Sequence, residues 1–547
     1  MLDFNYEQPY PSRRSPVMGM RGAVATSHPL AVQAGMRMLA SGGNAVDAAI
    51  AAAAALTVVE PTSCGLGGDA FAIVCEDGQL FGLNASGAAP GAVDAEQLRQ
   101  AGLCQMPRDG WLPVTVPGVV SAWVALHKRF GALPFSDVLA PAIEYAREGV
   151  PVPPVIAGYW SASQRRFGGR GGVFEEFERV FLPFGRAPRA GEVFRFSDLA
   201  ITLESIRDTM GESFYRGALA RAIAAHSGAA GGLIRLEDLQ RHVPQWVDPI
   251  SIRYRGYDIW EIPPNGQGIV ALIALGILEG FDLSVNEQLS AESLHLVAES
   301  LRLAFADAHA YVCDPSYSPD CAQELLDGDY LAMRRSLIRA DRAITRAQPG
   351  RIMGNTPPRQ AFDGDTVYLA TADWEGMMVS FIQSNYMGFG SGVVIPGTGI
   401  AMQNRGAGFS LEPGHPNELA PFKRPYHTII PGFITKQGTA LAAFGVMGGD
   451  MQPQGHVQVV SGIVDHLLNP QAAMDCPRIR VMDDESLALE PTIGAETVAQ
   501  LGVMGHSVRV MQESAGFGGG QMVWRDPSTG VLIAGSEPRK DGCAAAI

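Results

Sequence analysis

The chain changes from mainly helical to mainly β-type sequence near residue 340, and this change constrains the fold more than any other feature of the sequence. Before it, amphipathic helical segments predominate, such as 119–130 and 291–311. After a connector at 343–365 rich in Gly, Pro and polar residues, β-type segments predominate, beginning with 366–372 and 377–384. Helix-rich and strand-rich sections that interleave without a regular βαβ alternation predict a layered α+β fold.

Shorter signals in the first half place individual elements. Asn44 is a helix N-cap for the alanine-rich segment 45–58. A Glu-Asp-Gly turn sequence between 71–75 and 80–84 predicts a β-hairpin. By contrast, the segment 164–172 is rich in Gly and Arg and predicts a loop.

Composition sets the size of the core and the class of partner. With 547 residues, of which 47% are hydrophobic and 18% charged, the chain can bury a large core. Its 41 Lys and Arg against 56 Asp and Glu leave a formal charge of −15. Nucleic acids bind surfaces whose basic groups release counterions, so nucleic-acid binding is disfavoured. Small uncharged, zwitterionic or weakly anionic substrates fit this charge balance.

The sequence contains no segment that we expect to enter a membrane. The first residues lack the apolar stretch of a secretory signal, and the most apolar run, 45–59, is too short to span a bilayer. The seven cysteines form an odd set without a CxxC pair. This pattern is typical of reduced thiols, and it predicts a cytoplasmic protein without a membrane partner.

Several common catalytic motifs are absent from the sequence. It has no GxSxG nucleophile elbow, no P-loop, no GxGxxG and no HExxH. The segment 65–69, GLGGD, is not followed by the Lys-Ser/Thr of a phosphate cradle, so it predicts a tight turn. His295 and Glu299 lie four residues apart on an expected helix, where a structural hydrogen bond is favoured over a metal site.

Thr366 stands where a Gly-containing segment runs into an expected strand. Asp363, Gly364 and Asp365 precede it, and Val367 continues it in β-type sequence. Because many strands begin with Thr, this stretch alone is a weak signal. Its weight comes from residues at fixed offsets along the chain.

An ordered series of short motifs runs along nearly the whole chain. The series comprises Gly22-Ala23-Val24-Ala25-Thr26, Gly42-Gly43-Asn44-Ala45-Val46-Asp47-Ala48-Ala49, Glu60-Pro61, Gly65-Leu66-Gly67-Gly68-Asp69, Val116-Pro117-Gly118, Phe214-Tyr215-Arg216-Gly217, His295 with Glu299 and Phe305-Ala306-Asp307, Thr366, Lys423-Arg424-Pro425, Gly448-Gly449, and Gly535-Ser536-Glu537-Pro538-Arg539-Lys540-Asp541-Gly542. In this order the motifs resemble the γ-glutamyltranspeptidase (glutathione hydrolase) family of N-terminal nucleophile hydrolases. The segment 84–89 is similar to the cytosolic branch, which holds glutathione-hydrolase-like proteins and oxamate amidohydrolases.

The resemblance implies a fold and a maturation step. The fold is the four-layer αββα sandwich, in which two antiparallel sheets stack face to face between layers of helices. The chain is expected to cut itself between Asp365 and Thr366, giving a large fragment, 1–365, and a small fragment, 366–547. The two fragments are expected to remain interleaved as a heterodimer, with Thr366 at the start of a central strand.

The same resemblance implies a mechanism that physical chemistry supports. Cleavage leaves Thr366 with its hydroxyl and with a newly freed α-amine, whose pKa is about 7.7–8.0. The amine is then the general base for the hydroxyl, which attacks an amide of a small-molecule substrate and forms an acyl-enzyme. Water or an amine acceptor releases the acyl group. Because only a nucleophile, a base and oxyanion donors are needed, we expect no metal and no organic cofactor.

Three further residues receive catalytic roles from the family match. Gly448 and Gly449 follow an apolar strand and precede a helix expected to contain Val457 and Leu467. Backbone N–H groups at such a turn can point at one oxygen, and the helix dipole adds to their effect, so both glycines are expected oxyanion donors. Ser384 matches a second hydroxyl of the family, which contacts the amine of the nucleophile and assists processing.

The departures from the family pattern concern substrate choice. Ser86 stands where the family has an arginine that grips a substrate carboxylate, and Ala407-Gly408-Phe409 replaces a stretch whose aspartate holds an α-amine. Without that aspartate, a substrate ammonium loses a charge-assisted hydrogen bond of about 1.5–3 kcal/mol. Arg405 is an alternative carboxylate clamp. The candidate substrate-binding residues are Ser86, Asn404, Arg405, His427 and Thr428.

Because of these departures, the sequence does not determine which acyl group the protein prefers. The first interpretation is an amide hydrolase or acyltransferase for γ-glutamyl compounds, which belongs to glutathione metabolism. The second is the hydrolysis of a short acid amide such as oxamate, which has a carboxylate but no α-amine, or a cephalosporin acylase activity on the same fold. The third is an unprocessed homologue that binds a metabolite without catalysis. Retention of Thr366, Ser384 and the glycine pair argues against this third interpretation.

Overall fold

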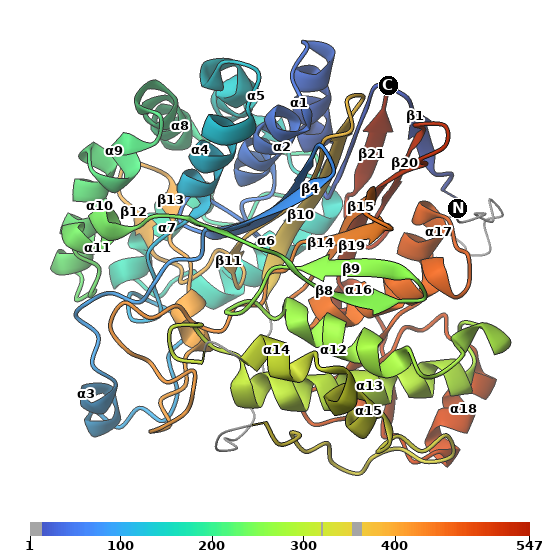
Figure 1. Ribbon diagram of the computed structural model, residues 1–547. Coiled ribbons are helices and arrows are strands. Elements are labelled where there is room, and N and C mark those ends of the chain that lie inside the picture. The colour runs from blue at the N-terminus through green and yellow to red at the C-terminus, as the bar shows by residue number, and fades with distance from the viewer. Residues whose placement is uncertain (1–13, 319–320, 353–363) are drawn as a thin grey trace.

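Two seven-stranded antiparallel sheets form the centre of the protein. The computed structural model describes residues 14–318, 321–352 and 364–547 (Figure 1). The first sheet has the strand order β1 (Val17–Gly19), β20 (Leu532–Ser536), β19 (Gly519–Arg525), β15 (Thr439–Met447), β14 (Gly432–Lys436), β9 (Tyr257–Glu261) and β8 (Ile250–Tyr254). The second has the order β21 (Cys543–Ala546), β2 (Gly22–Thr26), β10 (Asp365–Asp373), β11 (Met378–Tyr386), β3 (Asp69–Glu76), β4 (Gln79–Asn84) and β7 (Gln245–Val247).

The two sheets face each other across a shared apolar core. Phe71 and Tyr368 come from the second sheet, Phe433 and Val523 come from the first, and all four are fully buried in one cluster. Because side chains alternate along a strand, the opposite faces of both sheets need a cover of their own. Separate apolar clusters between each sheet and its helices provide it.

Helices form the two outer layers (Figure 1). The second sheet is covered by α1 (Pro29–Ala40), α2 (Ala45–Val59) and α4 (Val119–Phe130), with α5 (Phe135–Glu148) packed on α2 and α8 (Ser197–Thr209) packed on α5. The first sheet is covered by α12 (Gly268–Leu278), α16 (Met451–Val464) and α17 (Pro470–Asp475), with α13 (Ala291–Tyr311) packed on α12. The four-layer αββα sandwich expected from the sequence is therefore confirmed.

Smaller elements surround this sandwich. The short strands are β5 (Val150–Pro151), β6 (Val193–Phe194), β12 (Val394–Ile395), β13 (Ile400–Ala401), β16 (Ile479–Val481), β17 (Leu487–Leu489) and β18 (Val508–Val510). The other α-helices are α3 (Ala95–Gln100), α6 (Pro154–Phe167), α7 (Glu175–Phe181), α9 (Glu212–Tyr215), α10 (Ala218–Ala229), α11 (Leu236–Arg241), α14 (Cys321–Leu325), α15 (Gly328–Arg335) and α18 (Ala495–Val503). None of the helices in the described ranges is both long and apolar enough to cross a membrane.

The alanine-rich helix α2 shows how closely the layers pack. The side chain of Asn44 accepts hydrogen bonds from the N–H groups of Val46 and Asp47, and the Asp47 carboxylate accepts one from the N–H of Asn44. This capping box fixes the start of the helix. All 15 residues of α2 are buried, because small alanine side chains let α1, α5 and β10 approach it from different sides. The N-cap predicted from the sequence is confirmed.

Two local predictions were wrong at their ends. The loop expected at 164–172 is helical through Phe167, because that ring is fully buried against Phe174 and Phe177. The helix expected to reach Leu467 ends at Val464, and Leu467 is 42% exposed. The connector predicted at 343–365 lies partly outside the described residues.

The expected cleavage point lies in the middle of the fold. The strand β10 begins at Asp365 and β11 follows it, yet these two strands pair with β2 and β3 from the preceding part of the chain. The first sheet likewise joins β8 and β9 to β14 and β15. Fragments 1–365 and 366–547 would therefore share both sheets, as the interleaved arrangement requires.

Candidate active site

Thr366 lies at the irregular start of a central strand. The pairing of β10 with β11 shifts its register between Asp365 and Val367, so Thr366 sits in a β-bulge. Bulges re-aim side chains and interrupt regular pairing, and they occur frequently beside active sites. The Thr366 side chain is 1% exposed, yet the residue contributes to the wall of a cavity. The backbone of Thr366 is thus held in a central sheet, while the residue faces a cavity that a bound molecule could occupy.

Ser384 connects the Thr366 hydroxyl to the carbonyl of the preceding peptide. The Oγ1 of Thr366 donates to the Oγ of Ser384 at 3.2 Å, and that Oγ donates to the carbonyl oxygen of Asp365 at 2.7 Å. The backbone N–H of Tyr386 donates to the Ser384 Oγ at 2.7 Å and holds it in place. The structure thus brings together Thr366, Ser384 and Asp365, which the sequence proposed as nucleophile, helper and cleavage site.

Gln452 is a neighbour of Thr366 that the sequence reasoning missed. Its Nε2 donates to the Thr366 Oγ1 at 3.4 Å, and its Oε1 accepts from the N–H of Ile430 at 3.0 Å. The second bond fixes which end of the amide faces Thr366. Gln452 lies in the first turn of α16, three residues after Gly449, and this short offset from the glycine pair is the only signal that the sequence offers.

The glycine pair forms the turn between β15 and α16. Gly448 and Gly449 have φ angles of +123° and +57°, which side chains of L-residues rarely adopt. A Cβ on Gly448 would lie 3.1 Å from the Cα of Gly518. The Nε2 of Gln267 donates to the Gly449 carbonyl at 2.9 Å, which orients this turn. Gly448 lines the same cavity as Thr366, and Gly449 follows it without lining that cavity, so the oxyanion role of both glycines stays a prediction.

The cavity at Thr366 has a volume of about 600 Å³ and many charged walls. Its charged lining residues are Arg108, Asp109, Arg166, Asp365, Arg480 and Lys540. The Asp109 carboxylate pairs with Arg166 and with Arg170, each at 2.6 Å. Asp365 is itself the residue before the expected cut. The walls that remain beside Thr366 are therefore positively charged on balance.

The candidate substrate-binding residues are buried and do not form the walls of this cavity. Ser86, Asn404, Arg405, His427 and Thr428 are at most 1% exposed, and none of them lines the described cavity. Arg405 Nη1 donates to Thr428 Oγ1 at 2.7 Å, so these two candidates do meet. The hydroxyl of Ser86 instead donates to Asn84 Oδ1 at 2.7 Å.

Asn404 positions residues that do line the cavity. Its Oδ1 accepts from the N–H of Met387 at 3.2 Å, and its Nδ2 donates to the carbonyl of Arg108 at 2.8 Å. Arg405 acts in a similar indirect way, because its guanidinium stacks on the ring of Tyr386 at 4.2 Å. Tyr386 pairs with Asp365 across the bulge. These contacts give both residues positioning roles in this conformation.

Asp69 is the charged centre of the buried network. Its Oδ2 accepts from His427 Nε2 at 3.0 Å and lies 3.9 Å from Arg405 Nε. Burial raises the pKa of Asp69 to about 7, although Arg405 opposes this shift. Burial, and then the charge of Arg405, lowers the pKa of His427 well below its ordinary value. His427 is therefore neutral, with its proton on Nε2, since its Nδ1 accepts from the N–H of Ile429.

The glycines before Asp69 permit close backbone packing. A Cβ on Gly67 would lie 2.2 Å from the Ala401 carbonyl oxygen, and one on Gly68 would lie 2.4 Å from that of Ser384. The GLGGD segment is thus a tight turn against the strand that carries Ser384, as the sequence indicated.

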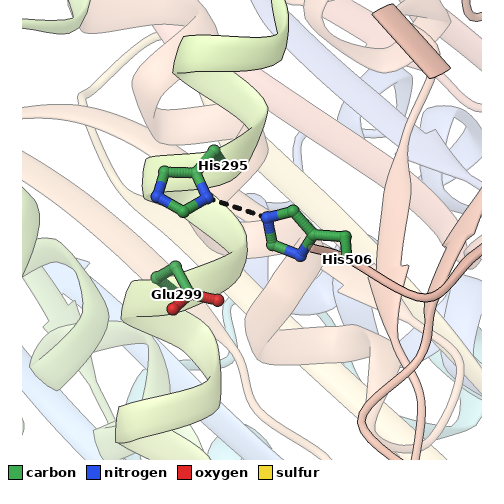
Figure 2. Close-up of side chains that lie close together, drawn as sticks. All are labelled: His295, Glu299 and His506. Atoms are coloured by element: carbon green, nitrogen blue, oxygen red, sulfur yellow. Dashed lines mark hydrogen bonds between the residues drawn. The ribbon is translucent and has the colours of Figure 1, made fainter. Parts of the chain in front are cut away.

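His295, Glu299 and His506 are the side chains most similar to a metal centre in the described ranges (Figure 2). His295 Nδ1 and His506 Nε2 are 2.8 Å apart, and His295 Nε2 donates to the Arg339 carbonyl at 2.7 Å. A carbonyl oxygen only accepts, so His295 Nε2 carries a hydrogen, and its Nδ1 shares a hydrogen bond with His506 Nε2. Glu299 accepts from Arg302 Nη1 and from the N–H of Ile344. All three groups are engaged with protein partners, and the Arg302 guanidinium disfavours a cation nearby.

Sequence similarity to known proteins extends over nearly the whole chain. The family profile described as Gamma-glutamyltranspeptidase matches residues 31–547. The chain belongs to this family. The glutathione hydrolase-like YwrD proenzyme of Bacillus subtilis (strain 168) is 35% identical, and the match covers 97% of this chain and 99% of that protein. The oxamate amidohydrolase proenzyme of Klebsiella pneumoniae is also 35% identical, with 96% and 98% covered.

A solved structure extends the comparison to the fold. The cephalosporin acylase from Bacillus halodurans is 50% identical, with a TM-score of 0.94 and coverage of 100% of this chain and 99% of that chain. This γ-glutamyltranspeptidase family member is thus an enzyme, an amide hydrolase or acyltransferase of the N-terminal nucleophile type. The family and the function class expected from the sequence are confirmed.

Proposed function

We propose that this family member is a proenzyme that cuts its own chain between Asp365 and Thr366. The observation that carries the proposal is the hydrogen-bonded series Thr366 Oγ1, Ser384 Oγ and Asp365 carbonyl oxygen. A hydroxyl that donates to a carbonyl withdraws electron density from its carbon. The Thr366 Oγ1 attacks that carbon, and its proton passes to the Thr366 nitrogen as the C–N bond breaks. Water then hydrolyses the resulting ester, which frees the α-carboxyl group of Asp365 and restores the Thr366 hydroxyl. Three relatives with 32–35% identity carry the word proenzyme in their names, which supports the same step here.

The cut chain then works as an amide hydrolase with Thr366 as its nucleophile. The freed α-amine takes the hydroxyl proton and later gives it to the departing amine of the substrate. The N–H groups of Gly448 and Gly449 stabilise the oxyanion, and Gln452 holds the Thr366 hydroxyl. Water releases the acid and regenerates the hydroxyl. The two fragments act together as one heterodimer.

Two acyl groups are candidates for the substrate. Family membership, with 28% identity to the glutathione hydrolase proenzyme of Bacillus subtilis, favours γ-glutamyl compounds and a place in glutathione metabolism. The loss of the aspartate at the Gly408 position and the 35% identity to an oxamate amidohydrolase favour short acid amides. The positive walls of the cavity suit the carboxylate of either group. The acidic residues among the described lining residues are Asp109, which pairs with Arg166 and Arg170, and Asp365, which precedes the proposed cut.

A cytoplasmic location is part of the proposal. All seven cysteines are free thiols, and five of them are buried. Thiols persist in a reducing compartment.

The mass of the purified protein tests the processing step. We expect two polypeptides of 365 and 182 residues, which together make up the 547-residue chain. They should appear by intact mass spectrometry under denaturing conditions and elute together under native conditions. Amide hydrolysis by preparations that contain only the 547-residue chain would reject the proposed function.

A further inference from the structure

The C-terminal motif places a lysine in the wall of the active-site cavity. Glu537 and Arg539 are buried in an ion-pair network with Arg478, which fixes the backbone on one side of the motif. On its other side, the Asp541 carboxylate accepts from the N–H groups of Val155 and Ile156 at the start of α6. Between these anchors, Lys540 is 7% exposed and lines the cavity with Thr366.

The ammonium group of Lys540 is held in a defined position. Its Nζ donates to the Tyr159 hydroxyl at 3.0 Å and lies 4.3 Å from the centre of the Tyr159 ring. Burial lowers the pKa of Lys540, but Tyr159, Glu60 and Asp365 together raise it above its ordinary value. Glu60 is fully buried and accepts from Ser27 and Ser63, and its burial raises its pKa to about 7. Lys540 is thus a positively charged group in the wall of the cavity that Thr366 and Asp365 also line.

In a self-cutting enzyme, the residue before the cut, here Asp365, takes the position of the acyl group of a substrate. During the proposed cut, Asp365 supplies the carbonyl that Thr366 attacks, so it occupies the place of a substrate acyl group. Its skeleton runs from this carbonyl carbon through Cα and Cβ to the carboxylate. A succinyl group has the same spacing between its carbonyl and its carboxylate. The uncut chain therefore carries an acyl group of known length and charge at the nucleophile.

We propose that Lys540 binds a carboxylate on the acyl group of the substrate, in the place that the Asp365 carboxylate holds before the cut. The inference rests on the proposed function, since it takes Thr366 as the nucleophile. The preferred substrates are amides of short dicarboxylic acids, with the free carboxylate two methylene carbons from the scissile carbonyl. A γ-glutamyl group sets its carboxylate one carbon farther away, and oxamate sets it directly on the carbonyl.

The reaction then follows the general scheme with one added contact. The Thr366 Oγ1 bonds to the carbonyl carbon of a succinyl amide, and its proton passes through the Thr366 amine to the leaving nitrogen as the C–N bond breaks. The succinyl ester keeps its free carboxylate on Lys540. Water adds to the ester carbonyl, and succinate leaves with one oxygen from water while Thr366 regains its proton. No redox partner is needed.

A matched pair of substrates tests the inference. Succinyl p-nitroanilide and butyryl p-nitroanilide have the same four-carbon acyl chain, and only the first ends in a carboxylate. For the wild-type enzyme we expect kcat/KM to favour the succinyl compound by about tenfold to a hundredfold, the range that a charge-assisted hydrogen bond allows. In Lys540→Met this ratio should fall to about one, while Lys540→Arg should keep most of it.

Lys436 supplies the control for the substitution. It lies 3.1 Å from the Tyr257 hydroxyl and 4.1 Å from the centre of that ring, which repeats the contacts of Lys540 outside the cavity lining. Lys436→Met should therefore leave the succinyl-to-butyryl ratio unchanged. Should Lys540→Met remain uncut, the wild-type enzyme supplies the answer by itself, since succinate should inhibit it and butyrate should not.

The outcomes separate this inference from the proposed function. A wild-type enzyme that is cut at 365/366 and hydrolyses amides without a succinyl preference, or that succinate does not inhibit, overturns the role of Lys540 and leaves the nucleophile assignment intact. A ratio in Lys540→Met equal to that of the wild type overturns it as well. A wild-type protein that hydrolyses amides as an uncut chain instead rejects the proposed function.

Discussion

Replacing Thr366 with alanine should leave the chain uncut and lower amide hydrolysis by at least about 10⁴-fold. The alanine has no hydroxyl to attack the Asp365 carbonyl, and without the cut it gains no α-amine. Both losses follow from one oxygen atom, because the same Oγ1 is proposed as nucleophile in processing and in turnover. Intact mass reports the first effect, and the release of p-nitroaniline from an acyl anilide reports the second.

Two further variants make this result specific. Thr366→Ser keeps a hydroxyl on a primary carbon and should still be cut, although more slowly. Thr439 is exposed at the start of β15, so Thr439→Ala should behave as the wild type does in both measurements. A Thr366→Ala protein that is cut, or that retains activity above one part in a hundred, would contradict the role of the hydroxyl.

Replacing Glu537 with glutamine should lower the free energy of unfolding by about 3–5 kcal/mol at neutral pH. The fully buried carboxylate accepts from Arg478 Nη2 at 2.9 Å, from the N–H of Gly520 at 2.6 Å and from Arg539 Nη1 at 2.6 Å. The neutral amide leaves Arg478 without its carboxylate partner in the interior, while Arg539 keeps its ion pair with Glu490. Urea unfolding followed by near-UV circular dichroism measures the loss, and Glu287→Gln on the exposed surface is the control.

The loss in Glu537→Gln should depend on pH with a definite sign. Burial alone would raise the pKa of Glu537, but Arg478 and Arg539 hold it below its ordinary value of 4.5. A carboxylate with a lowered pKa in the folded state stabilises the fold fully above its unfolded pKa. That contribution disappears as the pH falls through the folded pKa. The difference between wild type and variant should therefore be constant from about pH 6 to 8 and narrow below pH 4.5; a difference that widens in acid would contradict the ion-pair account.

Local elements of the fold were predictable because local chemistry determines them. The Asn44 cap and the alanine run specify α2, and the amphipathic pattern gives α4 and α13 with the bounds observed. The helix past residue 164 was not predictable, since burial of Phe167 by distant aromatic rings outweighs the local preference of glycine and arginine for a loop. The strand order of the two sheets likewise depends on long-range pairing.

The residues of the candidate site likewise include some that the sequence predicted and others that only the fold reveals. Thr366, Ser384 and the glycine pair were predicted from the family resemblance, and the structure places Ser384 and Gly448 beside Thr366, while their catalytic roles stay predictions. Gln452 and Lys540 reach the nucleophile only through the fold, which brings segments 86 and 174 residues away to Thr366, measured along the chain. The buried positions of Arg405 and His427 were also beyond sequence reasoning, because an Arg or a His in a loop carries no local sign of the carboxylate that will neutralise or bind it.

The most direct test of the account is to locate the acyl group during turnover. Wild-type enzyme is mixed with a slowly hydrolysed acyl anilide, quenched in acid, digested and analysed by peptide mass spectrometry. We predict that the acyl mass lies on a peptide whose first residue is Thr366, with its hydroxyl esterified. Turnover-competent enzyme in which the peptide bond between Asp365 and Thr366 is intact, or in which another residue carries the acyl group, would contradict the account.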